Sequence, residues 1–152
     1  MKVVEHPSKV KELVGQEIGV SDWLEIDQDR INMFAEATGD HQWIHVDVER
    51  AKKEFPAGTT IAHGFLTLSL IPALTGGLMK VENVSRGINY GCNKVRFTNM
   101  VPVNARVRGR QVLKEANNVK GDGVQLISEV TIEVEGQERP AMIAETIAII
   151  YP

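Results

Sequence analysis

Two short stretches of the chain carry side chains that could do chemistry. Asp40 and His45 lie five residues apart, and Ala62-His63-Gly64-Phe65 follows about twenty residues later. A carboxylate beside an imidazole can orient a water and move its proton near neutral pH. A glycine at the start of a helix lets a carbonyl approach backbone N–H groups that have no partner within the helix. Together the two stretches predict acid/base chemistry next to a carbonyl whose oxygen becomes an enolate.

Each of these residues also fits a structural interpretation. Asp40 could be a turn carboxylate, His45 a core histidine, and Gly64 a residue that only makes room for a strand. We favour the chemical interpretation for Asp40, because it follows a helix on a loop between rigid elements, where catalytic groups are often found.

A metal site is the main chemical alternative. His41 and His45 are four residues apart, a spacing that binds zinc when it lies on a helix. Gly39 ends the preceding helix, however, and Trp43-Ile44 between the histidines is typical of packing, so no metal is expected. Cys92 is not expected to act as a nucleophile, since no helix N-terminus or base stands beside it in the sequence. The other ligands that a metal site could use are Asp40, Asp47 and His63.

The elements that hold the acid/base pair follow from capping signals. Asp27 is a candidate N-cap for a helix over Gln28–Ala37, and Gly39 is suited to end that helix. Asp47 could cap a short helix over Val48–Glu54. The pair therefore lies between two helices.

A stretch without any charged residue runs from Phe55 to Met79. We expect a long helix over Ile61–Met79, capped by Thr60 and bent at Pro72. An uncharged run of this length also raises a membrane span as an alternative. Its glycines and prolines, and the lack of a second such run, favour instead a helix that is buried on all sides.

The rest of the chain is typical of strands, with an extended start over Val14–Ile26. The segment over 141–150 is apolar on both faces and should be a central strand. A sheet with one apolar and one charged face that curls around a single helix fits this order and gives an α+β class. The other expected strands cover 84–97, with a bend at Gly91, 105–115 and 124–135, and a turn lies within 117–123.

Arg106, Arg108 and Arg110 alternate along one expected strand. They could form a phosphate-binding patch. We favour the interpretation that they face solvent and pair with glutamates on the neighbouring strand. The candidate partners are Glu129, Glu133 and Glu135.

Size and composition limit the class of protein. A chain of 152 residues fits one domain over 1–152, large enough for a hydrophobic core without staples. The net charge of −3 gives no electrostatic case for binding nucleic acid or an anionic membrane. Cys92 alone cannot form an internal disulfide, and Met1–Gly15 has no apolar signal-peptide core, so a reducing, cytoplasmic setting is expected.

Three blocks of the sequence resemble the hydratase-2 or MaoC-like dehydratase family. The first is Phe34-x-x-x-Thr38-Gly39-Asp40-x-x-x-x-His45-x-x-x-x-x-Ala51, the second is Ala62–Phe65, and the third is Asn89–Phe97. The resemblance covers nearly the whole chain. It departs at Gln42-Trp43, where the family pattern has Asn-Pro, and that change could reshape the pocket.

The resemblance implies the hot-dog fold, a long helix wrapped by a curved antiparallel sheet, and a homodimer with a continuous sheet. It assigns Asp40 and His45 as the catalytic pair and the Gly64 N–H as the oxyanion donor. It implies no metal and no cofactor, since the coenzyme A thioester is the substrate. The candidate substrate-binding residues are His63, Trp43, Phe65, Asn89, Lys94 and Arg96, the last two with ion pairs as an alternative role.

The activity that the resemblance implies is (R)-specific enoyl-CoA hydration. Two alternatives remain. A hot-dog acyl-CoA thioesterase would also use a carboxylate and a backbone oxyanion hole, and a non-catalytic acyl-CoA-binding subunit would leave the chemistry to a partner. The intact Asp40/His45 pair argues against the last.

Overall fold

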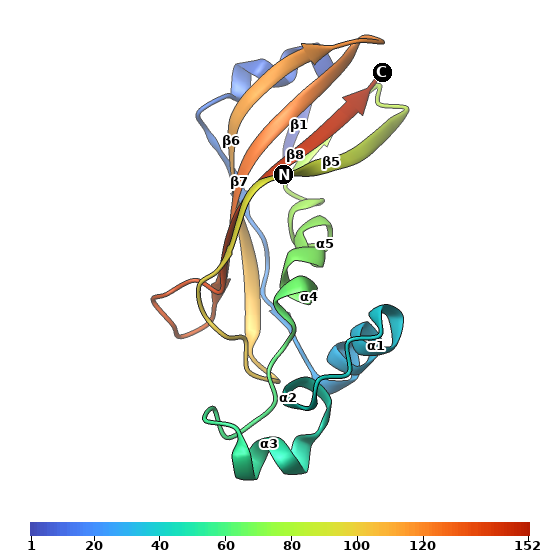
Figure 1. Cartoon of the computed structure of the whole chain (residues 1–152). Coiled ribbons are helices and arrows are strands. Elements are labelled where there is room, and N and C mark those ends of the chain that lie inside the picture. The colour runs from blue at the N-terminus through green and yellow to red at the C-terminus, as the bar shows by residue number, and fades with distance from the viewer.

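An antiparallel sheet curls around two short consecutive helices (Figure 1) in a computed structural model of residues 1–152. The strand order is β2-β6-β7-β8-β5, and β3 also pairs with β6. The expected α+β arrangement is confirmed, with β8 lying between two other strands as expected. The bounds of the strands are β2 Glu17–Val20, β3 Leu24–Glu25, β5 Arg86–Phe97, β6 Arg106–Val119, β7 Gly123–Val134 and β8 Met142–Tyr151.

The helix inside the sheet begins later than the sequence predicted. Helix α4 covers Gly64–Ser69, with His63 as its N-cap residue. Ile61 pairs with Pro102 in an isolated bridge, which keeps the preceding segment extended. Thr60 is not the cap, because its hydroxyl is buried and donates instead to the side chain of Gln28 at 2.6 Å.

The predicted single helix over Ile61–Met79 was also wrong in its continuity and its end. It is broken at Leu70, and helix α5 covers Ile71–Thr75. Pro72 lies in the first turn of α5, where its missing N–H removes no helical hydrogen bond. Gly76 and Gly77 follow, and the chain then enters β4 (Met79–Val81). None of the helices is long and apolar enough to cross a membrane.

Three further helices lie beneath the N-terminal end of α4 (Figure 1): α1 (Gln28–Thr38), α2 (Trp43–Val46) and α3 (Val48–Glu54). The caps predicted for α1 and α3 are confirmed. Asp27 accepts from the N–H of Arg30 at 2.9 Å, and Asp47 accepts from the N–H of Arg50 at 3.0 Å. Gly39 ends α1 with a φ of 77°, a conformation that glycine adopts without strain.

The main core lies between α4–α5 and the concave face of the sheet. Its fully buried members include Ile31 of α1, Val107 of β6, Ile132 of β7 and Met142 of β8. A second core lies under the N-terminal segment, for which the sequence predicted no element. There β1 (Lys2–Val4) pairs in parallel with β4, and a 3₁₀ helix covers Pro7–Leu13. The second core contains Val4, Val10, Ile18, Leu113, Val124 and Leu126.

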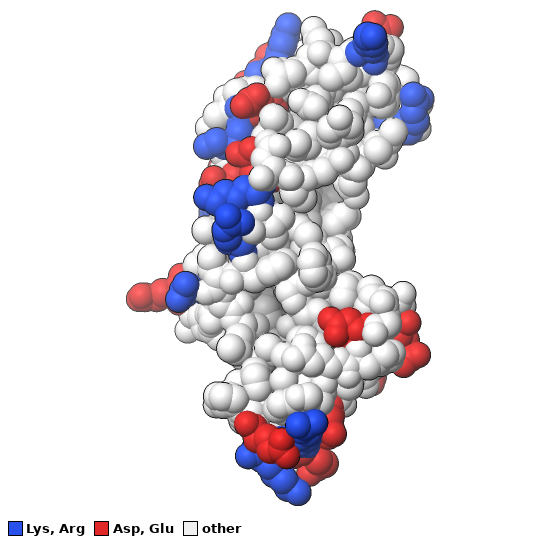
Figure 2. Space-filling model, in the orientation of Figure 1, with Lys and Arg blue, Asp and Glu red and all other residues white.

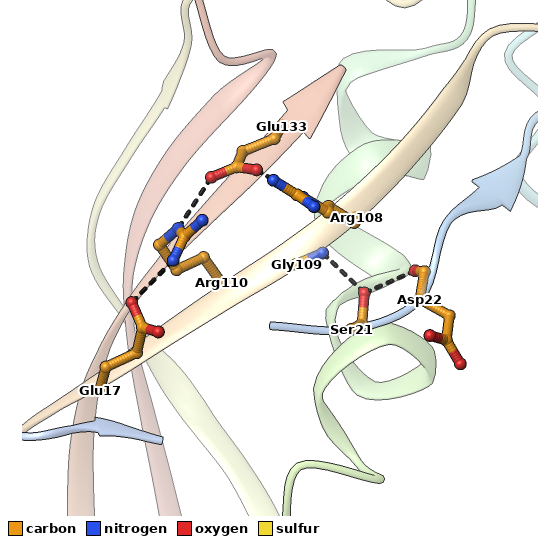
Figure 3. A network of polar contacts seen from close by, with 7 residues as sticks. All are labelled: Glu17, Ser21, Asp22, Arg108, Gly109, Arg110 and Glu133. Carbon is orange, nitrogen blue, oxygen red and sulfur yellow. Dashed lines mark hydrogen bonds and ion pairs between the residues drawn. The ribbon is translucent and has the colours of Figure 1, made fainter. Parts of the chain in front are cut away.

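The arginines of β6 pair across the sheet, as the structural interpretation expected (Figure 3). Glu133 of β7 accepts from Arg108 at 2.6 Å and from Arg110 at 2.8 Å. Arg110 also reaches Glu17 of β2 at 2.8 Å. Burial works against ionisation of Glu133, but the two arginines outweigh it and lower the pKa of this carboxyl.

The third arginine of β6 also has a glutamate partner, whereas one of the three candidate glutamates has no cation. Arg106 is paired with Glu135. Glu129 takes no ion pair, because the register places it opposite Val112 and Glu145 rather than opposite a cation. The bend expected at Gly91 is confirmed as a shift of register between Asn89 and Gly91.

Candidate active site

The fold brings Asp40, His45 and His63 together. One ring nitrogen of each histidine and one carboxylate oxygen of Asp40 lie within 4.8 Å of one another. They come from three elements: the loop after α1, helix α2 and the N-cap of α4. Both histidines are buried, whereas Asp40 is exposed in the single chain. The acid/base pair that the sequence predicted is thus assembled next to the start of α4.

His45 is held in one tautomer. Its Nδ1–H donates to the backbone carbonyl of Ile61 at 2.7 Å, so the lone pair of Nε2 is free. Burial lowers the pKa of His45; the bond to Ile61 and the charge of Asp40 oppose this, and the neighbouring His63 adds to it. The ring is therefore neutral near pH 7 and can accept a proton at Nε2.

His63 lies against both members of the pair. Its Nε2–H donates to the backbone carbonyl of Asp40 at 3.0 Å. Its ring stacks on that of His45, with centroids 3.9 Å apart and planes inclined by 25°. Phe34 of α1 lies on it as well, with ring centroids 4.9 Å apart. The remaining nitrogen, Nδ1, is buried and has no hydrogen-bond partner.

The carboxylate of Asp40 is left largely free. Its one hydrogen bond within the protein is a long one, accepted from the N–H of Gln42 at 3.3 Å. Gly39, in a left-handed conformation, turns the chain out of α1 immediately before it. An exposed carboxylate close to a neutral imidazole nitrogen can hold a water between the two groups.

Gly64 is required by its surroundings. A Cβ at this position would lie 2.9 Å from Cδ2 of Phe97 on β5, closer than real side chains approach. The N–H of Gly64 makes no hydrogen bond in the structure. Gly64 therefore both makes room for β5 and leaves a backbone N–H without a partner. The dipole of α4 adds little to this donor, because the helix has only six residues.

Two of the predicted substrate-binding residues lie near the pair but have packing partners. The guanidinium of Arg50 on α3 lies 4.1 Å from the ring centroid of Trp43 on α2, and Phe55, which follows α3, packs edge-on against the same ring. Phe65 is 66% exposed beside Gly64 and packs edge-on against Phe97.

The other three lie on β5 and are not brought to the pair. Asn89 lines a cavity of about 480 Å³ between α4–α5 and the sheet, which none of Asp40, His45 and Gly64 lines. Lys94 and Arg96 are exposed, and Arg96 donates to the carbonyl of Val95 rather than to an acid. The ion pairs considered as an alternative are not formed.

Sequence reasoning missed Gln28, which ties α1 to the site. Its Nε2 donates to the backbone carbonyl of His45 at 2.7 Å, and its Oε1 accepts from the hydroxyl of Thr60 at 2.6 Å. Nothing in the local sequence marks this residue, because its partners lie 17 and 32 positions away.

The cluster is poorly arranged to chelate a metal ion. The ring planes of His45 and His63 are nearly parallel, so their in-plane lone pairs do not converge on one point. Nε2 of His63 also donates to a carbonyl, which leaves only its enclosed Nδ1 as a ligand. His41, the other histidine considered, points to Glu36 at 3.6 Å. The geometry favours acid/base chemistry.

Comparisons with known proteins identify the family of the chain. The family model described as "MaoC like domain" matches residues 9–135. The chain is 48% identical over 147 residues to 3-hydroxyacyl-thioester dehydratase Z of Mycobacterium tuberculosis, which covers 97% of each chain. Among solved structures, a protein from Archaeoglobus titled a monoamine oxidase regulatory protein superposes with a TM-score of 0.80 at 21% identity, over 98% of this chain and 95% of that one.

A second solved structure is the (R)-hydratase from A. caviae involved in PHA biosynthesis. Its TM-score is 0.69 at 21% identity, with 91% of this chain and 96% of that one covered. At 21% identity the two solved structures support the fold alone. The family model and the M. tuberculosis relative match most of the sequence, and they identify the family. The chain therefore belongs to the MaoC-like family, with its hot-dog fold, and is an enzyme of the hydratase and dehydratase class.

Proposed function

We propose that this protein reversibly hydrates a trans-2-enoyl-CoA to a (3R)-3-hydroxyacyl-CoA. The observation that carries the proposal is the free carboxylate of Asp40 beside a buried, neutral His45 whose Nε2 has no partner. The M. tuberculosis relative, named a 3-hydroxyacyl-thioester dehydratase, supports a thioester substrate.

The reaction follows from the atoms present. Asp40 and His45 hold one water, and one of them takes a proton as the water oxygen bonds to C3. The double-bond electrons move toward C2 and the thioester carbonyl, whose oxygen becomes an enolate. The N–H of Gly64 donates to that oxygen. The pair then returns a proton to C2 on the same face, which regenerates both groups and gives syn addition. Dehydration is the reverse.

The proposal includes a second copy of this chain. Strand β5 pairs only with β8, so its other edge presents unpaired backbone groups along 12 residues. Such an edge attracts another strand. The exposed apolar side chains Ile88 and Tyr90 lie on it. Edge-to-edge pairing of two β5 strands would continue the sheet across a homodimer.

The test follows loss of enoyl absorbance with crotonyl-CoA and a longer trans-2-enoyl-CoA, using an (R)-specific coupling enzyme to read the product. Asp40→Asn and His45→Gln should each lower kcat by about 10²–10⁴-fold. His41→Gln is the matched control, since His41 is exposed on the same loop and outside the cluster. Full activity in either active-site variant would contradict the proposal. Release of free thiol without hydration would indicate a thioesterase.

A further inference from the structure

We propose that His63 is a positioning residue, which holds the loop of Asp40 and the ring of His45 in working geometry through its Nε2–H donor and its ring face. The inference rests on the proposed function and deepens it. His63 stands beside Gly64 in the chain, so one residue links all three groups assigned to the chemistry.

The donor fixes the loop that carries Asp40. The bond from Nε2 of His63 to the Asp40 carbonyl is the only hydrogen bond that joins residues 39–42 to a segment outside α1 and α2. The carboxylate itself has only the long bond to Gln42. Without His63, the loop would be tied to the start of α4 only indirectly, through the bonds that Ile44 and His45 of α2 make with Ile61.

The ring face fixes the imidazole of His45. His63 lies between Phe34 on α1, whose ring is tilted by 55° at a centroid distance of 4.9 Å, and His45 on α2, on which it stacks at 3.9 Å. The bond from His45 to Ile61 anchors Nδ1 of the ring. The stacked ring of His63 covers one face of the imidazole and limits its tilt, so the ring stays within 4.8 Å of the Asp40 carboxylate.

Packing alone does not explain a histidine here. The side chain is 2% exposed, and its Nδ1 is buried without a partner. An unsatisfied buried acceptor costs free energy that an apolar ring would avoid. A position that needed only a flat ring would be filled more stably by phenylalanine. The retained donor therefore points to the bond with the Asp40 loop.

Two substitutions separate the donor from the ring. His63→Phe keeps the stacked ring and loses the donor, and we expect kcat to fall about 10–100-fold with KM little changed and the melting temperature equal or higher. His63→Gln places an amide N–H near the position of Nε2 and should regain part of the lost kcat. His41→Gln is the control histidine and should match the wild type.

A residue with a merely structural role would behave differently. Equal activity of His63→Phe and the wild type would overturn the inference, as would loss of kcat and melting temperature together in both variants. If the aromatic variant does not fold, His63→Met takes its place, because methionine matches glutamine in length but has no donor. Equal kcat of the Met and Gln variants would then count against the donor.

Amide hydrogen exchange tests the inference without substrate. Exchange of residues 40–42 should be faster in His63→Phe than in the wild type, and close to the wild type in His63→Gln. If the wild type shows no hydration but these rates differ as expected, the proposed reaction fails while the positioning role stands. If exchange is unchanged in both variants although the wild type is active, the positioning role fails alone.

Discussion

At the scale of single residues, the site depends on which nitrogen of each histidine is engaged. The backbone carbonyls of Ile61 and Asp40 can only accept, so they place one proton on Nδ1 of His45 and one on Nε2 of His63. The free Nε2 of His45 is thereby left able to accept a proton. The residue types could be predicted from the sequence, whereas the tautomers follow from hydrogen bonds that form only in the folded chain.

The pH dependence of activity should report the buried His45. Its pKa is lowered from the ordinary value of about 6.5, chiefly by burial. A base with a lowered pKa stays neutral further into acid, so the acid limb of kcat/KM should have its midpoint below about 6.5. Steady-state rates across pH measure this midpoint for the free enzyme. A limb at or above the ordinary value would contradict the burial argument, and His41→Gln should leave the profile unchanged.

A methyl group at Gly64 should disturb the donor through Phe97. The added Cβ would meet the ring of Phe97 at 2.9–3.1 Å, so the helix start or the ring must move. We expect Gly64→Ala to lower kcat about 10²–10³-fold, the effect of losing an oxyanion donor.

Two further variants decide whether sterics cause that loss. Phe97→Leu in the Gly64→Ala background makes room and should recover part of kcat. Gly77→Ala is the matched control, because nothing lies within 4 Å of the Cβ it would add and its backbone is not left-handed. A double variant no better than Gly64→Ala would show that the glycine matters for another reason.

At the scale of elements, local signals predicted what local physics decides. Asp27, Gly39 and Asp47 cap their helices because a side-chain oxygen or a left-handed glycine needs only neighbours within three or four residues. The sequence predicted too early a start for α4, because Ile61 pairs with Pro102, which lies 41 positions away in the chain. Gln28 was not predicted as a site residue for the same reason, since its partners are also distant in the chain. Long-range pairing overrides the local pattern, and no local rule contains it.

The ion pairs of Glu133 on the outer face of the sheet should contribute to the free energy of unfolding. Glu133→Gln removes the charge that Arg108 and Arg110 share, and we expect the free energy of unfolding at pH 7 to fall by about 1–2 kcal/mol. The pKa of Glu133 is lowered in the folded state, so its contribution is complete above the unfolded value of about 4.5 and is lost as pH falls through the folded value. Urea denaturation at several pH values measures the difference.

Glu129→Gln is the control for this strand. Glu129 is exposed on β7 and takes no ion pair, so its replacement should leave the unfolding free energy within about 0.5 kcal/mol of the wild type. Both variants should keep their activity, because neither residue is near the catalytic cluster. If the two substitutions cost the same, the arginine network does not stabilise the fold.

At the scale of the whole molecule, charge and apolar surface are separated. Figure 2 shows charged side chains gathered around the edges of one face, with a broad uncharged band across its middle. Strand β5 is exposed along its length, and so are the side chains of Phe65 and Phe97. No other part of the chain covers this surface. The order of helix and strands could be predicted from periodicity. The open edge could not, because the sequence does not say which strand lacks a second neighbour.

Charge placed on the β5 edge should therefore separate two copies and reduce activity. Ile88→Lys combined with Tyr90→Lys puts like charges where two edges would meet, and light scattering should give the mass of one chain in place of two. Val48→Lys is the control, since Val48 is an exposed apolar residue on α3, at the other end of the molecule from β5 (Figure 1). A wild type that is active as one chain would contradict the paired edge. A dimer that survives both lysines would place the interface on another surface and leave the open edge of β5 to a different partner.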